Sequence, residues 1–192
     1  MTMLDTTPIP SESSETASPI LGATRAGVGR TVMLGVALVG AWAASIAGAL
    51  TLETSHNLHM CALFLHLGCL IAGFGAVMTL DWFGLLWLSG RRALADVLDV
   101  ADAAHPLIWM GLLGLAATGM LLEPSLTPLT CVKLGAVLLV AINGLNAMRL
   151  NHAMGRLDRD PDRPMMVWSA VTVSLSQLGW WTACLIGFLN AH

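Results

Sequence analysis

The sequence predicts an all-α fold, an integral membrane bundle of five transmembrane helices whose N-terminus is cytoplasmic. Of its 192 residues, 56% are hydrophobic and 11% are charged, whereas about 25% of the residues of a soluble domain are charged. The apolar residues form long tracts, as they do where lipid replaces water as the solvent. The Arg residues lie between these tracts or at their ends, and their distribution predicts which ends face the cytoplasm.

Residues 1–29 precede the first apolar tract and differ from it in composition. They are rich in Ser, Thr and Pro and carry Asp5, Glu12 and Glu15. They have neither the basic start nor the early apolar core of a secretory signal. Such a segment buries too little apolar surface to fold by itself. We therefore expect a disordered cytosolic tail at 1–29, followed by a five-helix transmembrane domain at 30–192.

The predicted spans are residues 31–52, 58–88, 106–122, 129–150 and 165–189. Four of them have roughly the length of about 20 residues with which a helix crosses the hydrocarbon core. The second tract is longer, but at about 1.5 Å per residue it is too short for two antiparallel spans and a turn. We expect a single helix there, which tilts or extends into the cytosol through Asp81 and Trp87. Residues 93–104 carry Asp at a spacing of three, which indicates the solvated face of a short helical extension.

The basic residues predict the orientation of the chain in the membrane. Eight of the nine precede the first span or flank the connections from the second span to the third and from the fourth to the fifth. They are Arg25, Arg30, Arg91, Arg92, Arg149, Arg156, Arg159 and Arg163. The other two connections, residues 53–57 and 123–128, contain no Lys or Arg. Since Lys and Arg near span ends are retained in the cytoplasm, the N-terminus is predicted inside and the C-terminus outside.

Small residues in the second span predict close helix packing. Gly68, Ala72 and Ala76 recur every four residues, so they share one face of a helix. Helices in lipid associate where small residues let their backbones approach. We therefore expect this face to contact a neighbouring helix.

Two histidines of the second span are candidate ligands of a cofactor or metal ion. His59 and His66 are seven residues apart, nearly two helical turns, so both imidazoles point the same way. The rest of their stripe is small or soft and includes Ala62, Cys69 and Gly73. This pattern leaves room for a neighbouring helix, a water molecule, a metal ion or a flat cofactor such as haem. The alternative is that each histidine is hydrogen-bonded to another helix.

Lys133 completes the candidate cofactor site. The second and fourth spans both begin on the outer side of the membrane, and Lys133 lies roughly one to two turns into the fourth. We therefore expect it at about the depth of His66. Its ammonium either extends to the interface or pairs with an acidic group, such as Glu53, Glu123 or a haem propionate. Soft sulfur together with imidazole suits Cu(I), and several Met and Cys side chains lie at this depth. They are Met60, Cys61, Met120 and Cys131. Haem b and copper are therefore the candidate ligands.

Asp81, His105 and Asn143 are polar residues toward the opposite side of the membrane. A titratable side chain within hydrocarbon is costly, which makes it a functional candidate. We expect Asp81 to contact His105 or Asn143. In the last span, Gln177, Trp180 and Trp181 are candidates for an interior wall.

The cysteines and the charge pattern limit the other possibilities. The four cysteines lie in apolar tracts without a C-x-x-C pair, which indicates free thiols rather than a zinc site or a disulfide framework. No cluster of Lys and Arg is interleaved with aromatic residues, so nucleic acid is not expected as a partner. The expected surroundings are the lipid bilayer and, if the chain assembles, other membrane subunits or further copies of itself.

Two runs of residues carry a resemblance to known membrane proteins. The first run comprises His66-Leu67-Gly68, Gly73, Gly75, Ala76, Asp81 and then Arg91 and Arg92. It resembles a group of small bacterial membrane proteins of undefined function. The second run extends from Lys133 to Asn143-Gly144-Leu145 and resembles the fourth span of that group. The resemblance implies a bacterial inner membrane as the location.

More distantly, residues 58–150 are similar to the CopD-type copper-transport domain and to HemJ-type haem-biosynthetic membrane oxidases. The first similarity implies the passage of copper, and the second implies haem b binding and tetrapyrrole oxidation. Residue by residue, the resemblance singles out His66, Asp81, Lys133 and Asn143. Whether the protein is an enzyme is left open.

Three hypotheses about function follow from the sequence. The first is a redox or metal-handling protein that binds haem b or a metal ion in the outer half of the bundle. His59 and His66 are about 10 Å apart along one helix, so they cannot ligate one haem iron together. The second is a non-catalytic membrane subunit or assembly factor, whose polar groups hold the helices together. The third is a small-solute or proton-coupled transporter with Asp81, His105 and Lys133 as titratable stations.

Overall fold

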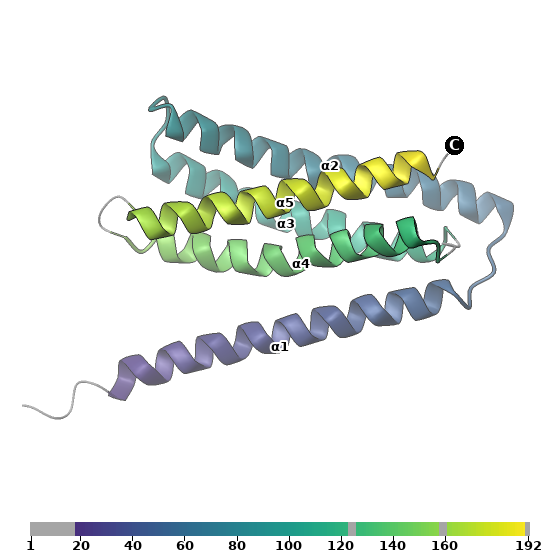
Figure 1. The fold of residues 1–192 in the computed structure, drawn as a ribbon, viewed down its shortest axis with the longest axis horizontal. Coiled ribbons are helices and arrows are strands. Elements are labelled where there is room, and N and C mark those ends of the chain that lie inside the picture. The colour runs from purple at the N-terminus through teal and green to yellow at the C-terminus, as the bar shows by residue number, and fades with distance from the viewer. Residues whose placement is uncertain (1–17, 123–125, 158–160, 191–192) are drawn as a thin grey trace, which may run out of the picture. The chain divides into compact units, whose positions relative to one another are not determined.

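The computed structural model describes residues 18–122, 126–157 and 161–190, and these contain helices and no strand. The helices are α1 (Ser18–Ala49), α2 (His56–Leu88), α3 (Leu94–Met120), α4 (Pro128–Met154) and α5 (Arg163–Leu189). Each of the five is long and apolar enough to cross a membrane. The predicted all-α class and the five spans are therefore confirmed, and Figure 1 shows the helices in chain order.

Two boundaries differ from those predicted. Helix α1 begins at Ser18, so residues 18–29 are helical where a tail was expected, and residues 1–17 lie outside the described part. Helix α3 begins at Leu94, because the expected short extension and the third span form one continuous helix. Pro106 lies inside that helix. The second span is a single helix of 33 residues, as predicted, with a length of about 50 Å.

Helices α2 to α5 are arranged as two antiparallel hairpins. Helix α2 packs mainly against α3 and α4 mainly against α5, while the contact between α3 and α4 is much smaller. The N-termini of α2 and α4 and the C-termini of α3 and α5 lie at one end of this bundle, the His59 end (Figure 1). The opposite end, with the α2–α3 and α4–α5 connections, is the Arg91 end.

Glycine lets α2 and α3 come into backbone contact. A Cβ atom on Gly111 would lie 2.6 Å from Cα of Gly73 and 2.9 Å from the carbonyl oxygen of Cys69. Nothing lies within 4 Å of the corresponding position on Gly68. Helix α2 therefore packs closely on α3, but the prediction is wrong for Gly68, because the contact face passes through Cys69 and Gly73. The stripe that the histidines share is in part covered by α3.

The core joins the two hairpins. Its buried members are Val77, Leu112, Leu115, Val140, Ala141 and Trp180. Trp180 of α5 is only 2% exposed, and its ring stacks on Phe74 of α2 with the centroids 5.5 Å apart. The other hairpin is closed in the same way as the first, because Gly179 lies against Val140 and the carbonyl oxygen of Ala136.

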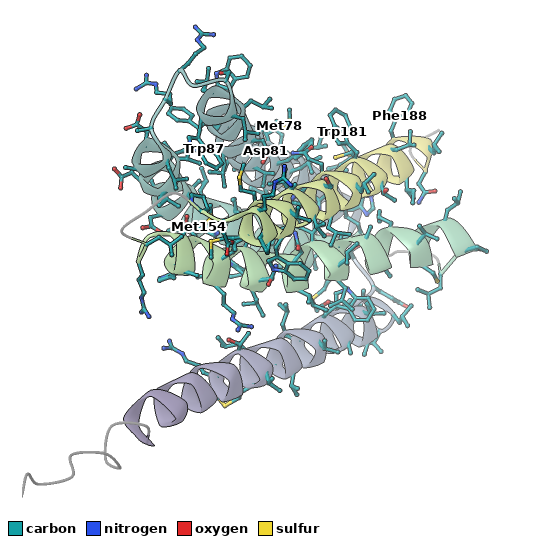
Figure 2. The ribbon with its side chains drawn as sticks, turned by 60° about the vertical axis from the view of Figure 1, so that its left-hand side comes forward. Met78, Asp81, Trp87, Met154, Trp181 and Phe188 are labelled. Atoms are coloured by element: carbon teal, nitrogen blue, oxygen red, sulfur yellow. The ribbon has the colours of Figure 1, made fainter. Side chains whose placement is uncertain are left out.

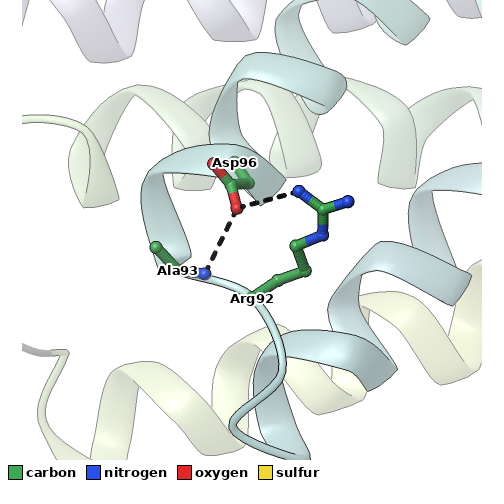
Figure 3. A network of polar contacts seen from close by, with 3 residues as sticks. All are labelled: Arg92, Ala93 and Asp96. Atoms are coloured by element: carbon green, nitrogen blue, oxygen red, sulfur yellow. Dashed lines mark hydrogen bonds and ion pairs between the residues drawn. The ribbon is translucent and has the colours of Figure 1, made fainter.

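The turn between α2 and α3 is built from local polar contacts at the Arg91 end. Gly90 has φ of 72°, a value that non-glycine residues adopt with strain. Asp96 then accepts a hydrogen bond from the backbone N–H of Ala93 at 3.3 Å and lies 3.7 Å from Arg92, as Figure 3 shows. Its carboxylate satisfies a free N–H at the start of α3 and opposes the positive end of the helix dipole.

Large apolar side chains cover the outside of the bundle. Phe64 is 77% exposed and Ile71 is 73% exposed, although both are strongly hydrophobic. Many similar residues on α2 to α5 are exposed. A water-soluble protein does not present such a surface, so the surrounding solvent is the lipid bilayer and the protein is a multi-pass membrane protein.

The contact between Gly73 and Gly111 is expected to decide the stability of the first hairpin. Substituting Gly111→Ala forces two backbones apart, and overpacking of this kind costs about 1–3 kcal/mol. The matched control is Gly75→Ala on α2, where nothing lies within 4 Å and where Ala stabilises a helix by about 0.5–1 kcal/mol. Thermal unfolding in detergent micelles, followed by circular dichroism, measures both. Equal effects of the two substitutions would contradict the contact.

Candidate functional site

His66 is held by a hydrogen bond between α2 and α3. Its Nδ1 lies 2.8 Å from the hydroxyl oxygen of Thr118, and that hydroxyl lies 2.6 Å from the carbonyl oxygen of Gly114. The carbonyl can only accept, so the Thr118 hydroxyl donates to it and accepts from the Nδ1–H of His66. One face of the ring is near Gly119, at which a Cβ atom would lie 3.7 Å from Cε1 of His66. His66 thus has the interhelical bond that was the alternative to a ligand role.

Around Lys133 and His66 the described residues form no ligand cluster. Lys133 is half-buried on α4, and its charge lies within electrostatic range of the His66 ring. His59 lies on the same stripe of α2, nearer the N-terminus of the helix, and is also half-buried. Within the described residues, no three His, Cys, Asp or Glu side chains are grouped so that they could hold a metal ion. Cofactor binding by His59, His66 and Lys133 therefore stays a prediction.

A cavity of about 770 Å³ lies toward the Arg91 end, between the two hairpins. All of α2 to α5 contribute to its walls, which are mostly Leu, Val, Met and Trp. Figure 2 labels four residues of this wall: Met78, Asp81 and Trp87 on α2, and Met154 on α4. Trp82 and Leu85 also line it and are 57% and 58% exposed, so the cavity reaches the lipid-facing surface.

Small residues explain why this space is left open. Each of the four helices contributes one of them to the cavity wall: Gly84, Ala101, Ala147 and Ala170. The larger side chains of the core lie nearer the middle of the bundle and do not reach into it. The cavity therefore results from short side chains that face each other where the two hairpins have few contacts.

Asp81 is bonded across the bundle to Gln177. The Gln177 amide donates to Oδ2 of Asp81 and lies 3.7 Å from the sulfur of Met78. Its carbonyl oxygen accepts from the indole N–H of Trp181 at 3.0 Å. The predicted contacts of Asp81 with His105 and with Asn143 are therefore wrong, because α5 rather than α3 or α4 presents the polar partner. Gln177 was predicted to line an interior wall, and it lines the cavity together with Asp81.

His105 is the second titratable residue that lines the cavity. Its Nδ1 lies 2.6 Å from the carbonyl oxygen of Ala101, one turn earlier in α3. Because a carbonyl oxygen only accepts, Nδ1 carries the proton and Nε2 of the neutral ring remains an acceptor. Within the described residues, no ion pair joins His105 to Asp81.

Asn143 has a structural role. It is 7% exposed and donates to the backbone carbonyl of Thr172 at 2.8 Å. Asn146 donates to the hydroxyl of the same residue at 3.0 Å. Together these amides hold α4 against α5 at the edge of the cavity, where Thr172 is part of the wall.

No family model, curated protein or solved structure matches the chain. The resemblance to CopD-type and HemJ-type proteins therefore stays a prediction. The candidate site rests on the geometry alone, and it comprises the cavity with Asp81, Gln177 and His105 in its walls.

The bond between Asp81 and Gln177 can be measured by a double-mutant cycle. Gln177→Leu leaves an intramembrane carboxylate without its donor, and we expect a loss of about 1–3 kcal/mol in the free energy of unfolding. The double variant Asp81→Leu with Gln177→Leu removes both polar groups and should recover part of that loss. Reversible unfolding in mixed micelles gives the coupling energy. Strictly additive effects would show that the two side chains do not interact.

Proposed function

We propose that the protein resides in a bacterial plasma membrane with its N-terminus in the cytoplasm and its C-terminus outside. The Arg residues support this orientation. Arg91 and Arg92 lie in the α2–α3 connection, and Arg156 and Arg163 lie at the α4–α5 connection. Both connections are at the Arg91 end, which the positive-inside rule assigns to the cytoplasm.

Its proposed function is to bind a small, membrane-soluble molecule in the cavity between the hairpins. The observation that carries this proposal is a space of about 770 Å³ with apolar walls and a few polar groups. Ligand sites in proteins typically have volumes of about 300–1,000 Å³ and walls that are mostly apolar, with a few polar groups that orient the ligand. Because Trp82, Leu85 and Val173 of the wall are also exposed to lipid, a ligand dissolved in the bilayer could enter sideways.

This proposal is closest to the small-solute transporter among the three hypotheses from the sequence. Two of the predicted titratable stations, Asp81 and His105, line the cavity, whereas Lys133 lies toward the other end near His66. The interhelical bonds of His66 and Asn143 also suit the second hypothesis, a non-catalytic membrane subunit held together by polar groups. A membrane subunit that holds a hydrophobic ligand would combine the two.

The orientation is tested with a reporter that is active only outside the cytoplasm. Alkaline phosphatase fused after residue 192 should be active, and the same enzyme fused within the α4–α5 connection, after Gly155, should be inactive. The positive-inside assignment is the reason for both expectations. A reporter that is active only cytoplasmically, such as a fluorescent protein, provides the complementary control. The reverse pattern would refute the proposed topology.

The binding function is tested with a neutral fluorescent probe. Nile red should bind saturably to the protein in lipid nanodiscs, after subtraction of its partition into empty nanodiscs. Substituting Ala170→Phe places a ring in the cavity wall and should weaken binding about tenfold or more, since steric overlap has to be relieved. The matched control is Ala116→Phe, because Ala116 is exposed, as Ala170 is, but lies outside the cavity wall. Absence of saturable binding to the native protein would refute the function.

A further inference from the structure

The described wall of the cavity carries one carboxyl group and no Lys or Arg. Among the described residues, Asp81 is the only acidic one in the wall. Within the described chain, Asp81 makes no ion pair. Its hydrogen-bond partner is the neutral amide of Gln177, and His105, the other titratable wall residue, is bonded through Nδ1 to its own helix.

An ionised carboxylate in a low-dielectric site is costly unless it is paired with an opposite charge. A neutral amide supplies one hydrogen bond and leaves the net charge in place. None of the described Lys and Arg residues forms an ion pair with Asp81: Arg92 lies against Asp96, and Lys133 is within electrostatic range of His66. Without a counter-charge such a group is neutral by protonation, so a cationic ligand would bind here by replacing the proton of Asp81.

The walls around Asp81 determine what kind of cation would fit. They are apolar and contain Trp82 and Trp87, whose indole faces attract cations. A small metal ion needs several oxygen ligands, and no cluster of three acidic, His or Cys side chains exists among the described residues. An organic cation with apolar substituents needs only one counter-ion and a hydrophobic surface.

We propose that the cavity binds a lipophilic cation, that is, an amine or quaternary onium ion with apolar substituents. The Asp81 carboxylate is its counter-ion, Gln177 orients that carboxylate, and Trp82 and Trp87 contact the cation through their rings. This inference rests on the proposed binding function and specifies the class of ligand. An anionic or zwitterionic lipid headgroup is disfavoured, because the wall offers no cationic group for a phosphate.

Two ions of nearly equal shape and opposite charge test the proposal. Equilibrium dialysis against protein in nanodiscs measures the binding of radiolabelled tetraphenylphosphonium and of tetraphenylborate, each corrected for empty nanodiscs. The phosphonium should bind saturably and displace Nile red, and the borate should do neither. Asp81→Asn preserves the shape of the side chain and should weaken phosphonium binding about tenfold or more. Asp81→Glu keeps the charge and should restore most of it.

The control is Asp99→Asn, which removes an exposed carboxylate outside the cavity wall and should leave phosphonium binding unchanged. Circular dichroism and gel filtration of each variant establish that it is folded. If both ions bind equally, or if Asp81→Asn binds the phosphonium as native protein does, the inference is wrong while saturable Nile red binding still upholds the proposed function. If neither Nile red nor the phosphonium binds saturably, the proposed function and the inference fail together.

Discussion

The close approach of helix backbones at glycine is the constraint on which the rest of this structure depends. In lipid, apolar side chains gain nothing by moving from the bilayer into a helix interface, so association relies on packing and on interhelical polar contacts. Gly111 lies against the backbone of Gly73 and Cys69, and Gly179 lies against the backbone of Ala136. One contact of this kind closes each hairpin. The polar contacts within each hairpin lie on helices that these close approaches hold together.

Polar side chains then fix the position of one helix along its neighbour, once the glycines have let the helices approach. The bonds of His66 to Thr118 and of Asn143 to Thr172 lie within the two hairpins, whereas the bond of Asp81 to Gln177 crosses from one hairpin to the other. Since the bilayer offers no water to a polar group, each of these bonds also relieves a desolvation cost. This crossing bond lies at the cavity, so a contact that helps to join the hairpins also places a carboxyl group beside an open space.

The cavity is a consequence of uneven packing between the hairpins. Near the middle of the bundle, Phe74 and Trp180 stack and fill the seam. Toward the Arg91 end the facing residues include Gly84, Ala101, Ala147 and Ala170, and the seam stays open. A site of this kind needs no dedicated loop or domain, because the same helices that fill the seam at one depth leave it open at another.

The sequence by itself determined the solvent, the fold class and the approximate spans. Hydrophobic tracts of about 20 residues are a local property, and in lipid they have no alternative to the helix. It also predicted a similar depth for Lys133 and His66, because depth along a span follows from counting residues.

Only the tertiary structure decided which residues meet across helices. Residue counting gives depth but not the rotation of one helix against another, so Asp81 was matched with His105 and Asn143 although α5 turns Gln177 toward it. Because the rotation of each helix is not known from the sequence, the cavity could not be predicted either. Four small residues on four helices leave a space only when all four face the same part of the bundle interior. Rotation and pairing are set by contacts such as that of Gly73 with Gly111, which join residues far apart in the chain and therefore leave no local pattern.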